Sequence, residues 1–222
     1  MNNKVCFWTM ASEQFDQAFG NMSRSLTKFH PDIPLIRFTF EDISKLGLNV
    51  KTMNVYPHLT KKLGEEYEKV IHIDSDILVC SPLKEVLEDD YDVATILDDD
   101  ETRQYKNLGF YASNSKEFNN FYSNEANKRY KDFNDGEQGV LNDILKNSKF
   151  KVKCLDHGEG SYCTSVAYSL NEIKRNGDML FFRGKPIRII HMVAHWNTPL
   201  KQLDFTGEVN DDVLEFINYL ES

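Results

Sequence analysis

The sequence predicts an α/β fold, with a mostly parallel twisted sheet and helices on both of its faces. Three observations support this prediction. Apolar runs alternate with segments of helical period from the N-terminus to Ile73. Two acidic residues, Asp74 and Asp76, directly follow one apolar run, where open α/β sheets bind their ligands. No linker or internal repeat divides the 222 residues, so we expect one domain over 1–222.

The expected elements begin in the order β-α-β-α-β. Apolar runs predict strands at 5–10, 34–40, 69–73, 77–80, 91–97, 108–112, 150–155, 179–182 and 186–191. Apolar residues at helical spacing predict helices at 15–26, 56–67, 83–87, 115–130, 137–146 and 211–220. The acidic pair therefore follows the third strand of the chain and not the first.

Charge and cysteine content limit the partners and the compartment. The net charge is −9 and no stripe of Lys and Arg stands out, which argues against nucleic acid as a partner. A ligand that carries phosphate would then need a local cation or metal. Cys6 and Cys80 lie in or beside apolar runs and are expected to be buried thiols, which fits a reducing compartment. With no signal-peptide pattern and no apolar run near the ~20 residues of a membrane span, we expect a soluble cytoplasmic protein.

The segment Asp74-Ser75-Asp76 is the strongest candidate for a functional site. Two carboxylates at the end of a strand can point to one side once the chain turns, and they supply hard oxygen ligands for Mg²⁺ or Mn²⁺. The alternative is a plain polar turn. Apolar runs on both sides favour the metal site, because burying an unpaired acidic pair is costly.

A second apolar run near the C-terminus also ends in a polar residue, His191. A neutral imidazole tolerates Mn²⁺, so His191 is a candidate third ligand. The alternative is a hydrogen-bonded histidine of the core.

Four segments in a fixed order resemble a known family. They are D-S-D-I-L-V after the apolar strand, N-L-G-F-Y-A-S-N at 107–114, F-N-D-G-E-Q-G-V-L-N at 133–142, and I-I-H-M at 189–192. Together they resemble the motifs of GT-A nucleotide-sugar glycosyltransferases of the glycogenin and bacterial galactosyltransferase type, family 8. The resemblance implies a retaining hexosyltransferase that uses Mn²⁺, or Mg²⁺, and a UDP-sugar donor. It further implies a glycan or glycoprotein acceptor, a nucleotide-binding half at 1–114 and a donor-sugar and acceptor half at 115–222.

The resemblance also assigns roles to residues around the nucleotide. Asp74, Asp76 and His191 match the metal ligands, with Asp74 and Ser75 beside the nucleotide. The backbone of Thr9, Met10 and Ala11 would face uracil, and Phe15 would stack on the base. Packing on a helix face is the alternative for Phe15.

Further residues match the donor-sugar side of the family. Asn107 and Gly109 match its N-S-G segment, and Asp98 falls near its sugar-binding Asp, although a solvated acidic loop is an equal alternative. Glu137 would bind donor hydroxyls, and Gln138 would stabilise an oxocarbenium ion. The alternative for Gln138 is a capping partner of its own helix. If Asp98 or Glu137 reached the acceptor as a base, inversion would replace retention.

The sequence departs from the family where the diphosphate would bind. His58, with Lys61 one turn later, stands where the family has Arg or Lys before the metal strand. The family's K-P-W after the histidine is replaced by H-W-N-T-P, which leaves His195 or Lys201 to supply any charge. A nucleotide-sugar-binding domain without turnover is therefore one alternative. A haloacid-dehalogenase-like phosphatase is another, but its Asp-x-Asp normally follows the first strand.

Overall fold

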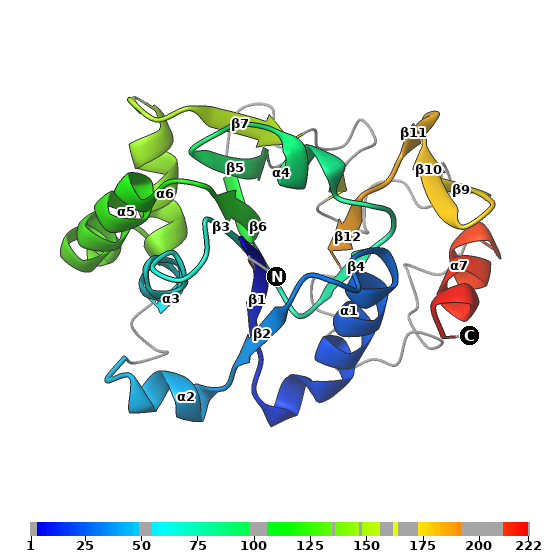
Figure 1. Ribbon diagram of the computed structural model, residues 1–222, viewed down its shortest axis with the longest axis horizontal. Coiled ribbons are helices and arrows are strands. Elements are labelled where there is room, and N and C mark those ends of the chain that lie inside the picture. The colour runs from blue at the N-terminus through cyan, green and yellow to red at the C-terminus, as the bar shows by residue number, and fades with distance from the viewer. Residues whose placement is uncertain are drawn as a thin grey trace.

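The computed structural model describes residues 4–48, 55–97, 106–134, 136–146, 148–155, 162–163, 173–191 and 211–221. Its centre is a six-stranded sheet in the order β2-β1-β3-β6-β5-β7 (Figure 1). The strands are β1 (Val5–Met10), β2 (Leu35–Phe38), β3 (Lys69–Ile73), β5 (Val93–Leu97), β6 (Lys106–Ser113) and β7 (Val152–Leu155). Only β6 runs antiparallel to its neighbours β3 and β5, so the predicted mostly parallel α/β sheet is confirmed.

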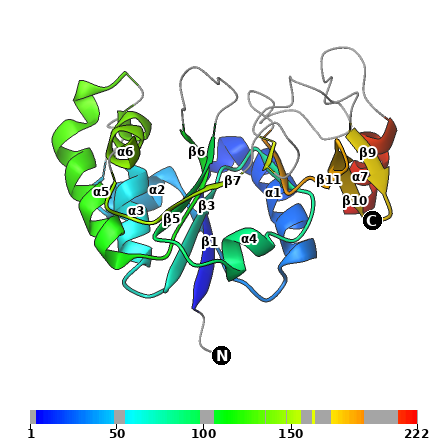
Figure 2. The same ribbon diagram turned by 90° about the horizontal axis from the view of Figure 1, so that it is seen from above.

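Helices cover both faces of this sheet, as alternation along the strands requires. Figure 2 shows α3 (Val55–Leu63), α5 (Lys116–Arg129) and α6 (Gly136–Lys146) on one side, with α1 (Asp16–Phe29) and α4 (Lys84–Glu88) on the other. Phe7 and Ile71 point toward α1, whereas Trp8 and Val70 belong to the core under α3. Alternate residues of a strand thus face opposite helical layers.

One helix was missing from the sequence prediction. The strand expected at 34–40 ends at Phe38, and α2 (Phe40–Lys45) follows. Thr39 caps this helix by accepting from the Asp42 N–H, while the Asp42 carboxylate accepts from the Thr39 N–H at 2.9 Å. This capping box stops the strand, because it favours a helix start over continued extension.

Two small sheets lie on the α1 side. One has the order β4-β12-β8, formed by β4 (Ile77–Val79), β12 (Ile189–His191) and β8 (Tyr162–Cys163). The other is formed by β9 (Ile173–Asn176), β10 (Met179–Phe182) and β11 (Lys185–Pro186), against which α7 (Asp211–Glu221) packs. The strand expected at 186–191 is therefore two strands in different sheets. Arg183 and Gly184, both with positive φ, form the tight turn before β11.

A buried lysine ties the start of β3 to the end of α4. Lys69 is 6% exposed, and its Nζ donates to the carbonyl oxygens of Val86 at 2.8 Å and Leu87 at 2.7 Å. A cation at the C-terminus of a helix satisfies carbonyls that have no partner within the helix. The link fixes the strand that carries the acidic pair.

Two remaining expectations concern the thiols and the membrane. Cys6 and Cys80 are both fully buried thiols, as predicted. Within the described residues, none of the helices combines the length and apolar character needed to cross a bilayer.

Candidate active site

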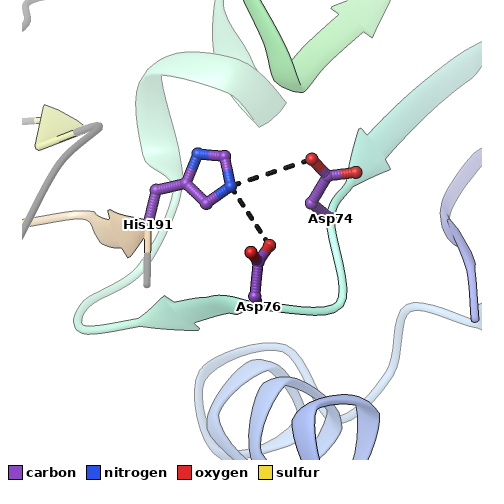
Figure 3. Close-up of side chains that lie close together, drawn as sticks. All are labelled: Asp74, Asp76 and His191. Carbon is purple, nitrogen blue, oxygen red and sulfur yellow. Dashed lines mark hydrogen bonds and ion pairs between the residues drawn. The ribbon is translucent and has the colours of Figure 1, made fainter. Parts of the chain in front are cut away.

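The two carboxylates reach one side because the chain turns sharply after β3. The Asp74 N–H donates to the Gly109 carbonyl at 2.7 Å, and the Ile77 N–H donates back to the Asp74 carbonyl at 3.2 Å. The N–H and the carbonyl of Asp74 are thus both bonded inside the protein. The side chains of Asp74 and Asp76 both point toward His191 (Figure 3).

His191 comes to this turn from the other end of the sequence. It ends β12, which pairs antiparallel with β4 so that His191 lies opposite Ile77. Its Nε2 lies 3.1 Å from Asp76 Oδ1 and 3.8 Å from Asp74 Oδ2 (Figure 3). One ligand atom from each of these three side chains lies within 4.8 Å of the others.

This donor set fits a divalent cation. Carboxylates suit Mn²⁺ and Mg²⁺, and a neutral imidazole is a borderline donor that Mn²⁺ also accepts. Burial, and then the nearby charge of Asp76, raise the pKa of the Asp74 carboxyl, so the paired negative charges cost free energy without a cation. The His191 side chain is 9% exposed, whereas that of Asp74 is 31% exposed and leaves an open side for a ligand.

A second histidine, His72, lies behind Asp74. It is fully buried on β3, with Nδ1 2.9 Å from the Leu108 carbonyl and Nε2 3.4 Å from Asp74 Oδ1. Its ring lies against Trp8 at 4.5 Å and edge-on to Tyr56 at 4.7 Å between centroids. Burial lowers the pKa of His72 to about 3, so the ring is neutral.

Glu137 and Gln138 approach from the first turn of α6. Gln138 Oε1 accepts a hydrogen bond from the Leu108 N–H at 2.9 Å. Glu137 is 5% exposed, and its Oε2 has no hydrogen-bond partner among the described residues. Burial, with a smaller contribution from the Asp74 charge, raises the pKa of Glu137 to about 7. A buried carboxyl with an unused oxygen can bind a polar ligand.

The residues expected to meet the base lie at the ends of β1 and α1. The Ala11 N–H donates to the Phe38 carbonyl at 2.9 Å, and the Ala11 carbonyl accepts from Arg37 Nε at 2.7 Å. Thr9 is fully buried, and Met10 is half-buried at the end of β1. Phe15 lies edge-on to Phe40 with centroids 6.3 Å apart. Stacking of Phe15 on a base stays a prediction.

Two of the residues expected at the diphosphate, His58 and Lys61, lie in the described part of the chain. His58 on α3 is held by α5, with Nε2 2.9 Å from Asn127 Oδ1 and Nδ1 3.2 Å from Ser123 Oγ. Lys61 lies one turn further along α3 and is half-buried. These assignments stay predictions, although α5 already engages both ring nitrogens of His58.

Other predicted site residues can be placed only in part. Ser75 lies in the turn between Asp74 and Asp76, and Gly109 accepts the Asp74 N–H. The backbone of Asn107 belongs to β6, while its side chain lies outside the described part of the molecule. Asp98, His195 and Lys201 lie outside the described residues.

Sequence reasoning missed two side chains of the site, His72 and Tyr56. The pKa of the Tyr56 phenol is raised well above its usual value, first by burial and then by the charges of Asp74 and Glu137. The Tyr56 ring also packs edge-on against His72, so it lies beside the site. A signal for His72 was present: it stands two residues before Asp74, hence on the same face of β3.

Comparisons with known proteins identify the class of fold. A scan against protein-family models gave no match, and a search of curated proteins gave none either. Among solved structures, a glycosyltransferase involved in the glycosylation of the major capsid of PBCV-1 matches with a TM-score of 0.60 at 11% identity, covering 98% of each chain.

Two further structures support the same class. The galactosyltransferase LgtC, solved with donor and acceptor sugar analogues, matches with a TM-score of 0.58 at 16% identity, over 97% of this chain and 96% of LgtC. The glycosyltransferase GlyE of Streptococcus pneumoniae TIGR4 matches with a TM-score of 0.52 at 15% identity, over 68% of this chain. That match spans about half of GlyE, 46% of its length. The chain therefore has the GT-A fold that its motifs predicted.

Proposed function

We propose that this protein transfers a hexose from a UDP-sugar to an acceptor hydroxyl, with a divalent cation and with retention at the anomeric carbon. The observation that carries the proposal is the convergence of Asp74, Asp76 and His191 within 4.8 Å at the end of β3. In an α/β sheet this edge is the ligand-binding edge. The GT-A fold gives the donor its expected place.

The metal ligands account for departure of the nucleotide. Asp74, Asp76 and His191 would hold Mn²⁺ or Mg²⁺, which when bound neutralises the charge that develops on the UDP leaving group. The chain itself fixes the geometry, because the Asp74 N–H is bonded to Gly109 and β4 is paired with β12. Ser75 and the backbone of Thr9 to Ala11 then lie on the nucleotide side.

Glu137 and Gln138 account for the sugar. Glu137 Oε2, which has no hydrogen-bond partner in the described part of the chain, can accept a hydrogen bond from a donor hydroxyl, and near neutral pH the carboxyl can also donate. Gln138 Oε1 accepts from the Leu108 N–H with one lone pair, and its second lone pair would stabilise positive charge at the anomeric carbon. The acceptor that completes the reaction is a glycan or glycoprotein hydroxyl.

One observation favours a second candidate, a nucleotide-sugar-binding domain without turnover. His58, which stands where the family has a cation, is bonded through both ring nitrogens to α5. Binding would then depend on the metal ligands, while departure of the diphosphate would lack this support.

The test is release of nucleotide from a panel of UDP- and GDP-sugars with Mn²⁺ or Mg²⁺. Asp76→Asn is the test variant. The control is Asp90→Asn, an exposed carboxylate paired with Lys151 at 2.7 Å. Metal-dependent UDP release that Asp76→Asn abolishes and Asp90→Asn keeps supports the transferase. Binding without release supports the second candidate, and phosphate release from a phosphomonoester regardless of UDP-sugar would overturn both.

A further inference from the structure

Two of the three candidate metal ligands depend on one short pair of strands, β4 and β12 (Figure 1). Each strand has three residues; Asp76 directly precedes β4, and His191 is the last residue of β12. Their antiparallel pairing places His191 opposite Ile77, next to Asp76. The distance between these two ligands is therefore determined by the register of this ladder.

Both faces of the ladder are apolar. Ile77, Val79 and Ile189 lie in the core beside α1, and Leu78 and Ile190 lie in the core beside α7. Register is strongly specified where the two faces of a strand differ in polarity, because a slip by one residue exchanges the faces. Here such an exchange replaces apolar residues by apolar residues. The register therefore depends more on polar contacts at the ends of the strands.

Arg188, the residue before β12, makes such contacts with the segment that follows β4. Its Nε lies 3.0 Å from Glu85 Oε2 and its Nη2 lies 2.5 Å from Glu85 Oε1, so the ion pair with α4 has two parallel hydrogen bonds. Its Nη1 donates to Ser81 Oγ at 3.0 Å, and its carbonyl accepts from the Cys80 N–H at 2.8 Å. The Arg188 side chain is only 12% exposed, which limits screening of the ion pair by solvent.

The partners of Arg188 extend this cluster to the rest of the small sheet. Ser81 Oγ donates in turn to the Ile187 carbonyl at 2.7 Å, on the segment that enters β12. The hydroxyl of Tyr162, on the third strand β8, donates to Glu85 Oε2 at 3.4 Å. The polar cluster thus joins β4, β12 and β8 at the end of the sheet opposite to the metal ligands.

We infer that Arg188 and Glu85 are positioning residues of the metal site, because they fix the register that brings His191 to Asp76. A guanidinium and a carboxylate form both hydrogen bonds only in one relative position, so the pair disfavours a slipped ladder. A slip by two residues would move His191 by about 7 Å along β4, out of reach of Asp76. The kinetic part of the inference rests on the proposed function, whereas the metal affinity and the register do not.

Two substitutions of Arg188 test the pair. Arg188→Met removes the guanidinium and keeps a long apolar side chain, whereas Arg188→Lys keeps the charge without the two-pronged contact. We expect Mn²⁺ affinity, measured by titration calorimetry, to fall about tenfold or more in Arg188→Met and about threefold in Arg188→Lys. Loss of a positive charge by itself would favour a bound cation, so weaker binding has to come from displaced ligands. The Mn²⁺ concentration for half-maximal UDP release should rise by the same factors.

Arg175→Met is the matched control. Arg175 also pairs with a glutamate on a helix, with Nη1 3.2 Å from Glu215 Oε2, but it belongs to the sheet of β9, β10 and β11. This variant should keep the Mn²⁺ affinity of the unaltered protein. Normal affinity in a folded Arg188→Met would overturn the inference, as would an equal loss in the two Met variants. If Arg188→Met does not fold, normal affinity in Arg188→Lys would overturn it.

Amide hydrogen exchange in the metal-free protein tests the register without any turnover. In Arg188→Met the amides of β4 and β12 should exchange about tenfold faster or more, while those of β1 and β3 keep their rates. Equally faster exchange in all four strands would show a loss of global stability and would overturn the inference.

The same measurements separate the inference from the proposed function. The expected affinities and exchange rates, together with no UDP release by the unaltered protein, would refute the proposed function and leave the inference supported. Metal-dependent UDP release by the unaltered protein, together with normal Mn²⁺ affinity in Arg188→Met, would refute the inference alone.

Discussion

The expected metal ligands of this site, Asp74, Asp76 and His191, and the residues expected at the donor sugar, Glu137 and Gln138, differ in what their polar groups contact. We call these two groups the metal side and the donor-sugar side. On the metal side, His191 lies within 3.8 Å of both carboxylates, so the three side chains contact one another. On the donor-sugar side, Glu137 is almost completely buried, and one of its oxygens has no described partner. The three side chains of the metal side are therefore already brought together. The donor-sugar side maintains a buried carboxyl at a cost in stability, which a bound ligand can offset.

Removing a ligand on the metal side should have the largest effect. For His191→Ala we expect Mn²⁺ affinity to fall by about 100-fold and metal-dependent turnover by two to three orders of magnitude, because two carboxylates remain without the imidazole. Titration calorimetry and initial rates measure the two effects. In the unaltered protein, metal at about 100 times its Kd should stabilise the fold by about 2.7 kcal/mol, and the variant should gain only about 0.4 kcal/mol at the same concentration. An equal gain in the variant would place the metal elsewhere.

Glu137→Gln should separate activity from stability. The pKa of Glu137 rises from 4.5 to about 7 on folding, so the folded state binds more protons between these values and its stability falls as pH rises through that window. We expect the variant to be about 1–2 kcal/mol more stable than the unaltered protein at pH 8, and to lose about 100-fold in kcat. Glu117→Gln, an exposed carboxylate paired with Lys149, is the control. Equal stabilities at pH 8 would show that the Glu137 carboxyl is not costly.

An opposite pH effect should come from His30, which lies away from the site. His30 Nε2 accepts from the Leu83 N–H at 3.0 Å, and burial lowers the pKa of the ring. The unfolded state therefore binds more protons, and stability should be lost as the pH falls below about 6.5. Chemical unfolding of His30→Gln, which keeps an acceptor and does not titrate, should lack this loss. If the acid slope persisted in the variant, other groups would account for it.

The smallest effect is expected at His58. Because α5 engages both of its ring nitrogens, His58→Ala should change the KM for the donor by less than about threefold and lower the free energy of unfolding by about 1 kcal/mol. Donor titrations and urea unfolding measure the two quantities. A rise in KM of tenfold or more, with normal stability, would instead assign His58 to the diphosphate and restore the family pattern.

The sequence predicted those parts of the fold that local pattern specifies. Strand β3 and the acidic pair follow from an apolar run and its end, and the order of four motifs predicted the GT-A fold. Strand β9 was missed because Ile173 is its only apolar residue and the strand is stabilised by its partner β10. The two-residue turn Gly177-Asp178, with Gly177 at φ 60°, was a hairpin signal that could have revealed it.

The site was predictable only where a side chain acts by its own chemistry. Asp74, Asp76 and His191 were chosen as metal ligands, and the structure brings them together. Leu108 contacts Gln138 and His72 through its backbone N–H and carbonyl, and the type of its apolar side chain gives no sign of these contacts. The engagement of His58 by Ser123 and Asn127 depends on how α3 packs against α5, which periodicity does not specify.

The antiparallel pairing of β4 with β12 has a consequence for the whole chain. Asp76 and His191 are 115 residues apart in sequence, so a cation between them closes a long loop as a reversible crosslink. Loop closure restricts the unfolded chain most when the loop is long. The C-terminal elements, strands β9 to β12 and helix α7, should then exchange their amide hydrogens more slowly when metal is bound. Helix α7, although it supplies none of the three ligands, would report whether the site is filled.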